Sequence, residues 1–559
     1  MNALATIGGR RASATLGMIV LAAILGVLVA MPLGTVLLQA VTDNAGPARS
    51  FTAEHIVKVL TGQIYWIALL NTAIVCGGAA LVATALGTLF AWIFVRTDTF
   101  ARTALEQIAQ IPIFIPPFVG AVAWALLFAP RVGAVNHILI TVDAPFQFNI
   151  YSHGGMLCVI GIYLAPYVMM IVAAAMRSVD PSLEEAAQVA GLNRVQTALR
   201  ITAPLLAPAI LSGAVLAFTI AVGLFGTPVV LGWSRQILLL TSRIWIGTQA
   251  VPPEYGVTAV LSTYLILLSA MAMAAQRYVL AGRSFVTVTG KGFRPRLVRL
   301  GPWAIATLAA AVLYVVLTIL APLLVLLAAA MSTYTWSGQY SIANIWTGLD
   351  SEDVWLTMEN SIVISFISAT LATLLGMAIS WITVRTRIRG RRLLEYLVLL
   401  PISVPGIAFG VGVMLFWVGV PVAVYGTALI IIFAFIGRFT AYAVRSISAG
   451  LVQLHPELEE SARVCGYGPL RTFARITLPL ILPSVLAGWL LLFSFFMTEL
   501  SMVILLYSAS NRMFSILSFE VWNVGDLSRL AALSLLQTSI GLTLAILLKA
   551  AFRSRTEVL

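Results

Sequence analysis

Long apolar segments, separated by short polar loops, run along nearly the whole chain. A helix that spans a bilayer needs about 20 apolar residues. Twelve segments approach or exceed that length, at residues 14–40, 64–95, 106–129, 155–176, 204–231, 257–281, 301–330, 357–384, 394–418, 427–448, 479–507 and 527–551. The pattern therefore predicts an all-α polytopic membrane protein with about 12 transmembrane helices.

Two stretches of the chain occur twice, which indicates an internal duplication. Residues 66–97 align without a gap with residues 355–386, at an offset of 289. Residues 182–208 align in the same way with residues 457–483, at an offset of 275. Since each copy contains six predicted helices, an even number, both copies run in the same direction. We expect two parallel six-helix repeats related by a pseudo-twofold axis along the membrane normal, with a pathway between them.

The basic stretch 282–300 is expected to join the two halves. The first half is then residues 1–285, with a core at about 64–281, and the second is residues 286–559, with a core at about 355–551. The change of offset predicts 14 extra residues in the first half, in a loop that precedes the repeated segment at residue 182.

Composition and charge agree with a membrane location. The chain is 60% hydrophobic and only 10% charged, whereas soluble domains carry roughly 25% charged residues. Its net charge of +12 could indicate nucleic-acid binding, but the Lys and Arg residues lie in short loops between apolar segments without interleaved aromatics. Their asymmetry predicts that both termini, and both copies of the loop that begins near residue 182, face the cytoplasm.

The duplicated loops, at residues 181–203 and 456–478, are the strongest candidate functional sites. Each is expected to form a short helix with acidic residues in its first turn, where the helix dipole favours them, and small residues that let another surface approach. A glycine then ends the helix. The candidate residues are Glu184, Glu185, Ala186, Ala187 and Gly191 in the first copy, and Glu459, Glu460, Ser461, Ala462 and Gly466 in the second.

These loops resemble the Glu-Ala-Ala signature of the membrane subunits of bacterial binding-protein-dependent ATP-binding-cassette importers. The resemblance implies a type I importer fold in the bacterial inner membrane and an extracytoplasmic solute-binding protein as partner. It also implies two copies of an ATPase, one on each loop, that bind the ATP and Mg²⁺. The chain itself lacks the phosphate-binding motif Gly-x₄-Gly-Lys-Ser/Thr, so it is expected to be a transport subunit without a cofactor or catalytic residues of its own.

The resemblance also suggests a substrate. Residues 225–232, 240–245 and 252–256 look like those of fused, double-length permeases for ferric iron. Similar permeases for thiamine, aminoethylphosphonate or polyamines remain alternatives. A secondary transporter of twelve helices is the competing class, but it would need several acidic residues within helices and would have no use for the paired loops.

Glu499 is the one acidic residue predicted to lie deep in a spanning segment, 479–507. Such a carboxylate either lines a pathway for a cation or pairs with an arginine of the preceding helix, Arg438 or Arg445. The equivalent position in the first half is Leu224, so this acidic feature would be one-sided. The spacing of the three cysteines and four histidines predicts no metal site.

Overall fold

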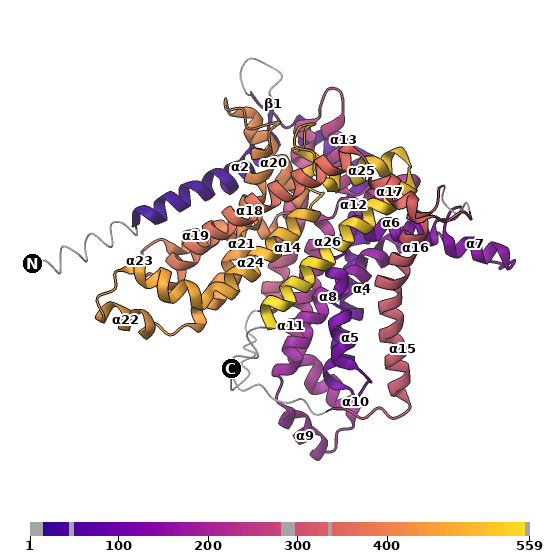
Figure 1. Ribbon diagram of the computed structural model, residues 1–559, viewed down its shortest axis with the longest axis horizontal. Coiled ribbons are helices and arrows are strands. Elements are labelled where there is room, and N and C mark those ends of the chain that lie inside the picture. Colours follow the sequence, from indigo (N-terminus) through magenta and orange to yellow (C-terminus); the bar gives the residue numbers. More distant parts are fainter. Residues whose placement is uncertain (1–14, 44–49, 281–296, 334–337, 554–559) are drawn as a thin grey trace, which may run out of the picture.

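The computed structural model describes residues 15–43, 50–280, 297–333 and 338–553, which form an almost entirely helical molecule (Figure 1). In these ranges the only sheet is a two-stranded antiparallel one, formed by β1 (Thr42–Asp43) and β2 (Ser50–Phe51). The predicted boundary between the halves, at residues 285 and 286, lies outside the described residues.

The predicted number of spans agrees with the structure. Within the described ranges, ten helices are long and apolar enough to cross a membrane, and two bent helix pairs bring the possible total to twelve. The first is Thr15–Gln39, which contains the π-helical turn η1 (Gly26–Ala30) and α2 (Met31–Gln39).

The other elements of the first half follow in chain order. They are α3 (Glu54–Thr61), α4 (Gln63–Arg96), α5 (Arg102–Ile108), η2 (Ile111–Phe114), α6 (Pro117–Phe128), α7 (Ala134–Thr141), α8 (His153–Ser178), α9 (Pro181–Val189), α10 (Arg194–Thr197), η3 (Ala198–Thr202), α11 (Ala203–Gly223), α12 (Gly226–Gly232), η4 (Trp233–Arg235), α13 (Leu240–Gln249) and α14 (Tyr255–Leu280).

The second half repeats most of this order. Its elements are α15 (Trp303–Val315), η5 (Val316–Leu320), α16 (Ala321–Met331), α17 (Ile342–Leu349), α18 (Glu352–Arg385), α19 (Arg391–Leu399), η6 (Leu400–Ser403), α20 (Gly406–Gly419), α21 (Ala428–Gln453), α22 (Glu457–Val464), α23 (Pro469–Thr472), η7 (Phe473–Thr477), α24 (Leu478–Thr498), η8 (Val503–Leu505), α25 (Phe514–Val524) and α26 (Leu527–Arg553).

The duplication extends to the helix boundaries. The long helices α4 and α18 begin and end at residues 289 apart, whereas α8 and α21, and also α11 and α24, begin and end at residues 275 apart. The offset changes between α6 and α8. There the first half contains the additional helix α7, which Figure 1 shows projecting from one side of the molecule.

Two predicted spans, 106–129 and 394–418, are bent rather than straight. The chain turns by 99° between η2 and α6, and by 114° between η6 and α20. Each turn contains a proline, Pro116 or Pro405, in an extended conformation. Proline has no N–H to donate and clashes with the preceding helical turn, so a helix cannot continue through it.

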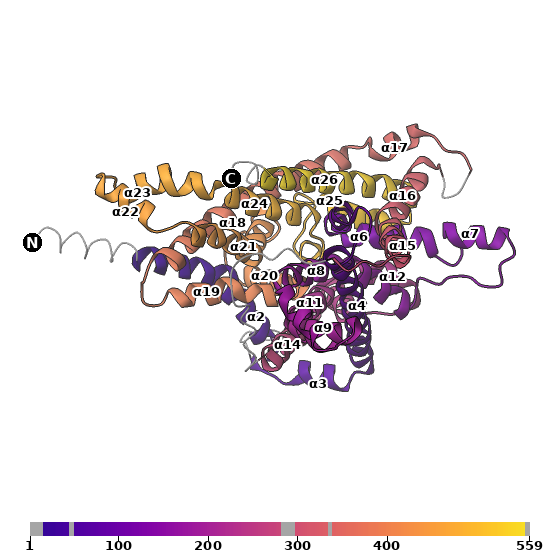
Figure 2. The ribbon, with the colours of Figure 1, turned by 90° about the horizontal axis from the view of Figure 1, so that it is seen from below.

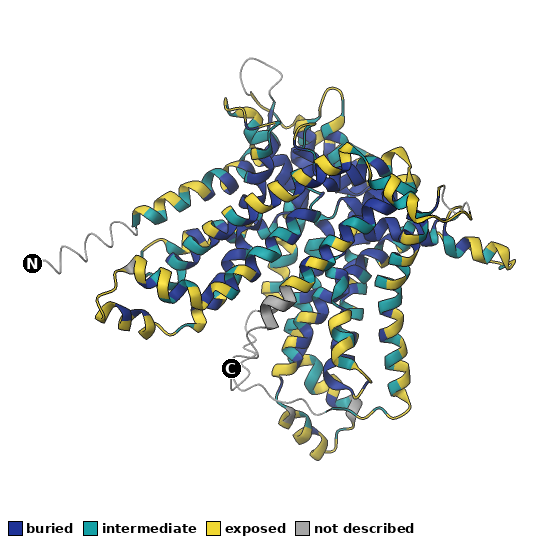
Figure 3. Ribbon diagram, in the orientation of Figure 1, coloured by how far each residue is buried: buried dark blue, intermediate teal, exposed yellow. Residues whose placement is uncertain are grey.

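The two halves diverge from a common packed region. Figure 1 shows α9 and α22 at the ends of two separate arms, Figure 2 shows the arm of α9 end-on from below, and Figure 3 shows buried residues concentrated where the arms meet. The first helix of each half crosses to the other half: α2 packs against α20, and α16 packs against α6. The close approach of Gly412 to the Pro32 carbonyl oxygen belongs to the first of these contacts.

Candidate functional site: paired loops and a membrane cavity

The two duplicated loops form the helix–turn–helix that the sequence predicts. The short helices α9 and α22 are followed by Gly191 and Gly466, which adopt φ angles of +90° and +83°. Glycine adopts this left-handed conformation without the cost that a Cβ atom would add. The chain then returns to the long helices α11 and α24 through the π-helical segments η3 and η7.

In the first loop, Glu184 points inward and fixes the loop to the membrane helices. Its Oε2 lies 3.3 Å from Nη1 of Arg96, the last residue of α4. Arg96 is buried and also donates from Nη2 to the Met176 carbonyl oxygen of α8. The Thr202 hydroxyl donates to Glu184 Oε1 at 2.7 Å. One carboxylate therefore connects α9 to the ends of α4 and α8 and to the start of α11.

The second loop repeats this arrangement around Glu459. Its Oε1 lies 3.0 Å from Arg385 Nε at the end of α18. Arg385 donates from Nη2 to the carbonyl oxygens of Leu451 and Leu454, both at 3.1 Å. The Thr477 hydroxyl donates to Glu459 Oε1 at 3.4 Å. We call Arg96–Glu184 and Arg385–Glu459 the loop anchors.

The remaining candidate residues divide between the interior and the outer surface of the loops. Ala187 and Ala462 are buried, whereas the others, Glu185, Ala186, Gly191, Glu460, Ser461 and Gly466, are exposed. Apolar side chains are exposed beside them at equivalent positions. Val189 and Val464 are 90% and 88% exposed, and Leu183 and Leu458 are 47% and 46% exposed. Each loop thus presents a small surface with both acidic and apolar side chains.

Sequence reasoning missed the arginines of the loop anchors. Arg96 and Arg385 are at equivalent positions of the first repeat, at its offset of 289, which was a usable signal. A basic residue at the end of a predicted span is, however, already explained by membrane topology. The sequence alone gave no reason to connect either arginine with a glutamate in another repeat.

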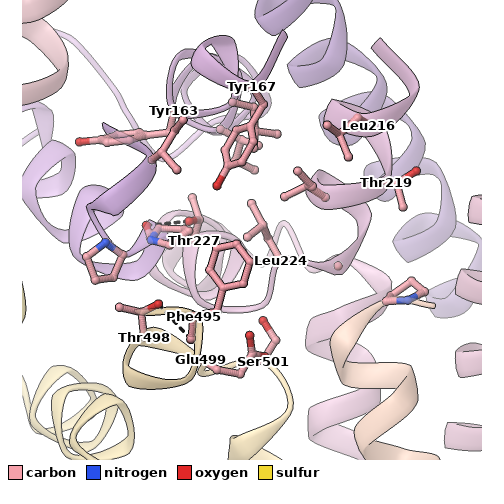
Figure 4. Close-up of a pocket in the computed structure, with 18 of the residues that line it drawn as sticks. Tyr163, Tyr167, Leu216, Thr219, Leu224, Thr227, Phe495, Thr498, Glu499 and Ser501 are labelled. Atoms are coloured by element: carbon pink, nitrogen blue, oxygen red, sulfur yellow. Dashed lines mark hydrogen bonds between the residues drawn. The ribbon is translucent and has the colours of Figure 1, made fainter. Parts of the chain in front are cut away.

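A cavity of about 570 Å³ lies between the two halves. It is lined where helices break: at Pro116 and Pro405 in the bent spans, and at Leu224 and Glu499 after the ends of α11 and α24. Figure 4 shows side chains from both halves around this space. Irregular backbone at membrane depth is tolerated where it is buried in protein or lines a cavity, so these four breaks mark the cavity as the candidate pathway.

The prediction that Glu499 lies within a spanning helix is wrong. Glu499 is the residue after α24 and has an extended backbone conformation, with φ −70° and ψ 122°. Its Oε1 accepts a hydrogen bond from the Met502 amide at 3.0 Å, and its carbonyl oxygen accepts one from the Ser515 hydroxyl at 2.8 Å. These contacts stabilise the break, which the continuous apolar sequence conceals.

The two hypotheses for Glu499 are both compatible with its position. The carboxylate lines the cavity and also lies 3.6 Å from Arg438 Nη1 of α21. Its equivalent in the first half, Leu224, lines the same cavity with nearly the same backbone conformation, φ −71° and ψ 133°. The position of Arg438 is occupied there by Tyr163. The ion pair is therefore present on one wall only.

A cluster of aromatic side chains lies beside the cavity and includes residues of α13 and α25. Phe118 lines the cavity, and its ring lies 6.3 Å from that of Phe519. Phe519 in turn packs against Phe225 and Trp245, both at 5.6 Å between ring centroids. These rings come from both halves, so they hold the halves together beside the cavity.

The chain matches the sequence profile of the family described as "Binding-protein-dependent transport system inner membrane component" at residues 83–284 and 372–555. It is 28% identical over 489 residues to the ferric transport system permease protein FbpB of Actinobacillus pleuropneumoniae, covering 83% of this chain and 68% of that protein. It is also 28% identical to the putative ferric transport system permease protein FbpB 1 of Haemophilus influenzae, covering 84% and 74%.

A shorter relative matches a smaller part of the chain. The sulfate transport system permease protein CysT of Salmonella typhimurium is 27% identical over 218 residues, covering 36% of this chain and 77% of that protein. The family profile matches twice, once in each half, and covers more than half of the residues. The chain is a multi-pass membrane protein that belongs to the family of inner-membrane components of binding-protein-dependent transport systems.

Proposed function

We propose that this chain is the permease subunit of an ATP-driven importer that carries ferric iron delivered by an extracytoplasmic binding protein. The observation that supports ferric iron as the substrate is the length of the match to the ferric permeases. It covers 83% and 84% of this chain and includes both halves. Two halves in one polypeptide would supply the complete pathway, with the cavity between them.

Transport by the reconstituted complex tests this proposal. The complex would contain this chain, its ATPase and its binding protein in liposomes, with ATP supplied on the side that the ATPase faces. We expect accumulation of iron-55 that requires ATP and the binding protein. Uptake of sulfate, putrescine, thiamine or aminoethylphosphonate without uptake of iron would refute ferric iron as the substrate and leave the importer class intact.

The duplicated loops are proposed to seat two copies of the ATPase subunit, which binds ATP and Mg²⁺. The exposed acidic and apolar residues of α9 and α22 support this assignment, and the loop anchors would transmit movement of the ATPase to α4 and α18. Changing Glu185 and Glu460 together to arginine should abolish transport while the chain still inserts. Transport at the original rate in this double variant would rule the docking assignment out.

The orientation follows from the same proposal. Both loops and both termini are expected on the cytoplasmic side, and residues 131–153, which include α7, on the outer side. In a variant whose native Cys76, Cys158 and Cys465 are replaced by serine, single cysteines introduced at 182–200 and 457–475 should react with an impermeant maleimide only in inverted vesicles, and those at 131–153 only in intact cells. Labelling of either loop from outside would exclude this topology.

A further inference from the structure

The charged side chains that line the cavity are Arg438, Arg445 and Glu499 within the part of the chain that the structure describes. All three belong to the second half. Their equivalents in the first half are Tyr163, Met170 and Leu224, none of which carries a charge. The cavity therefore has one neutral wall and one charged wall, and two guanidinium groups face one carboxylate.

The carboxylate is already engaged. Glu499 Oε1 accepts from the Met502 amide at 3.0 Å and lies 3.6 Å from Arg438 Nη1. A carboxylate whose charge is offset by a neighbouring guanidinium, and one of whose oxygens already accepts a hydrogen bond, is a poor ligand for a second cation. Glu499 is thus better placed to orient Arg438 than to bind a passing metal ion.

The guanidinium groups, in contrast, keep most of their donors. An arginine has five N–H donors in a planar fork. Among the described residues, Arg438 forms an ion pair only with Glu499, and Arg445 forms none. Arg445 is also exposed to the cavity. Such donors match the paired oxygens of a carboxylate, sulfate or phosphate group.

We infer that the charged wall of the cavity selects a species that bears anionic oxygens, and that Arg445, with Arg438, recognises them. This inference rests in part on the proposed function. A bare trivalent cation would meet an excess of positive charge in the cavity. If the substrate is ferric iron, the ion therefore passes as a complex whose oxygen ligands make it neutral or anionic. A free oxyanion would bind to the same charged wall. The chemical group common to the iron complex and the oxyanion is the anionic oxygen.

The sign of the charge effect tests the inference. In the reconstituted complex, uptake would be measured with iron-55 supplied as its citrate complex and with sulfur-35 sulfate. We expect Arg445→Gln to reduce uptake of the transported solute at least tenfold through a higher KM, and Arg445→Lys, which keeps the charge but loses the planar fork, to restore only part of it. Glu499→Gln, which leaves Arg438 without its ion-pair partner, should reduce uptake less than Arg445→Gln does, because both guanidinium charges remain. Arg389→Gln, the same substitution at an exposed arginine that does not line the cavity, is the matched control and should leave uptake unchanged.

Every other pattern contradicts the inference. Loss of uptake in Glu499→Gln with normal uptake in Arg445→Gln would indicate a cation pathway. Equal loss in both variants would indicate that these residues act only through structure, and no loss in either would remove them from substrate recognition. If the wild-type complex carries sulfate and no iron, the ferric proposal fails while the charge test still applies. If it carries only a cation such as putrescine, both fail.

Discussion

Only 7% of the Glu459 side chain is exposed, although the next residue, Glu460, is exposed. Burying a carboxylate is costly unless a cation and hydrogen-bond donors compensate it. Arg385 Nε at 3.0 Å and the Thr477 hydroxyl at 3.4 Å provide this compensation. The two adjacent glutamates of the motif thus have different roles, one facing the membrane helices and the other the exterior.

This difference can be measured. Glu459→Gln leaves Arg385 without its counter-charge, so we expect the free energy of unfolding to fall by about 3 kcal/mol. The adjacent Glu460→Gln should change it by no more than about 0.5 kcal/mol, as is usual for exposed positions. Denaturant titration in mixed micelles would compare the two. Equal effects of both variants would contradict the inward role of Glu459.

The sequence predicted the two duplicated helix–turn–helix loops, but not the directions of the side chains within them. The motif does not distinguish Glu184 from Glu185, or Glu459 from Glu460. The rotation of the short helix relative to α4 or α18 determines which glutamate of each pair faces the membrane helices. For Glu499, the sequence left the pairing partner open between Arg438 and Arg445, and the structure places it beside Arg438. That choice depends on the tertiary packing of α21 against α24, which the sequence pattern does not determine.

Among the helices, α4 and α18 pack most extensively, against α8 and α21 respectively. The matching glycines Gly87 and Gly376 explain the close approach. A Cβ atom at Gly87 would lie 2.7 Å from the Ala165 carbonyl oxygen and 2.7 Å from Val168 Cβ. Small residues at such contacts let helix backbones approach closely in membranes.

A pair of glycines on α4 provides a test of this packing. Gly87→Ala should lower the free energy of unfolding by about 1–3 kcal/mol, because the helices must separate to accept the methyl group. Gly77→Ala on the same helix has no atom within 4 Å of the new Cβ and should not lower the free energy of unfolding, because alanine is the better helix former. Thermal unfolding in detergent would rank them. A Gly87→Ala protein as stable as Gly77→Ala would show that α4 and α8 can adjust freely.

The number of spanning segments was predictable from the sequence, but whether each segment forms one straight helix or a bent pair was not. A straight span and a bent one have the same apolar composition, so hydropathy identified residues 106–129 and 394–418 without their bends. Pro116 and Pro405 lie 289 residues apart, at the offset of the first repeat, but proline is tolerated in many transmembrane helices and so does not by itself predict a bend. Their effect depends on the cavity beside them, which allows the irregular backbone to remain without helical hydrogen bonds.

For the whole molecule, the exchanged first helices make each half depend on the other. Leu28, Pro32 and Val36 of the first helix face the second half, where a Cβ atom at Gly437 would lie 2.6 Å from the Leu28 carbonyl oxygen. In return, the Tyr314 hydroxyl of α15 donates to the Ile162 carbonyl oxygen of α8. These contacts bury surfaces that neither half covers alone.

Expression of separate halves should reveal this dependence. Residues 1–285 and 286–559, produced together, are expected to associate into a detergent-stable complex, whereas each alone should aggregate on extraction. Removal of residues 1–40 from the first fragment should prevent the association, because it uncovers the surface of α20 that α2 occupies. Size-exclusion chromatography would measure the outcome. Stable association without residues 1–40 would mean that the central interface suffices.

The ion pair on only one wall of the cavity also has an evolutionary meaning. In a symmetric homodimer every residue near the axis is encoded once and appears twice, so a charge there is always doubled. A fused gene removes that constraint, since each copy accumulates substitutions separately while the protein keeps a fixed ratio of the two. Leu224 and Glu499 illustrate this freedom: a single substitution in the fused chain alters one wall of the cavity, whereas the same substitution in a homodimer would alter both.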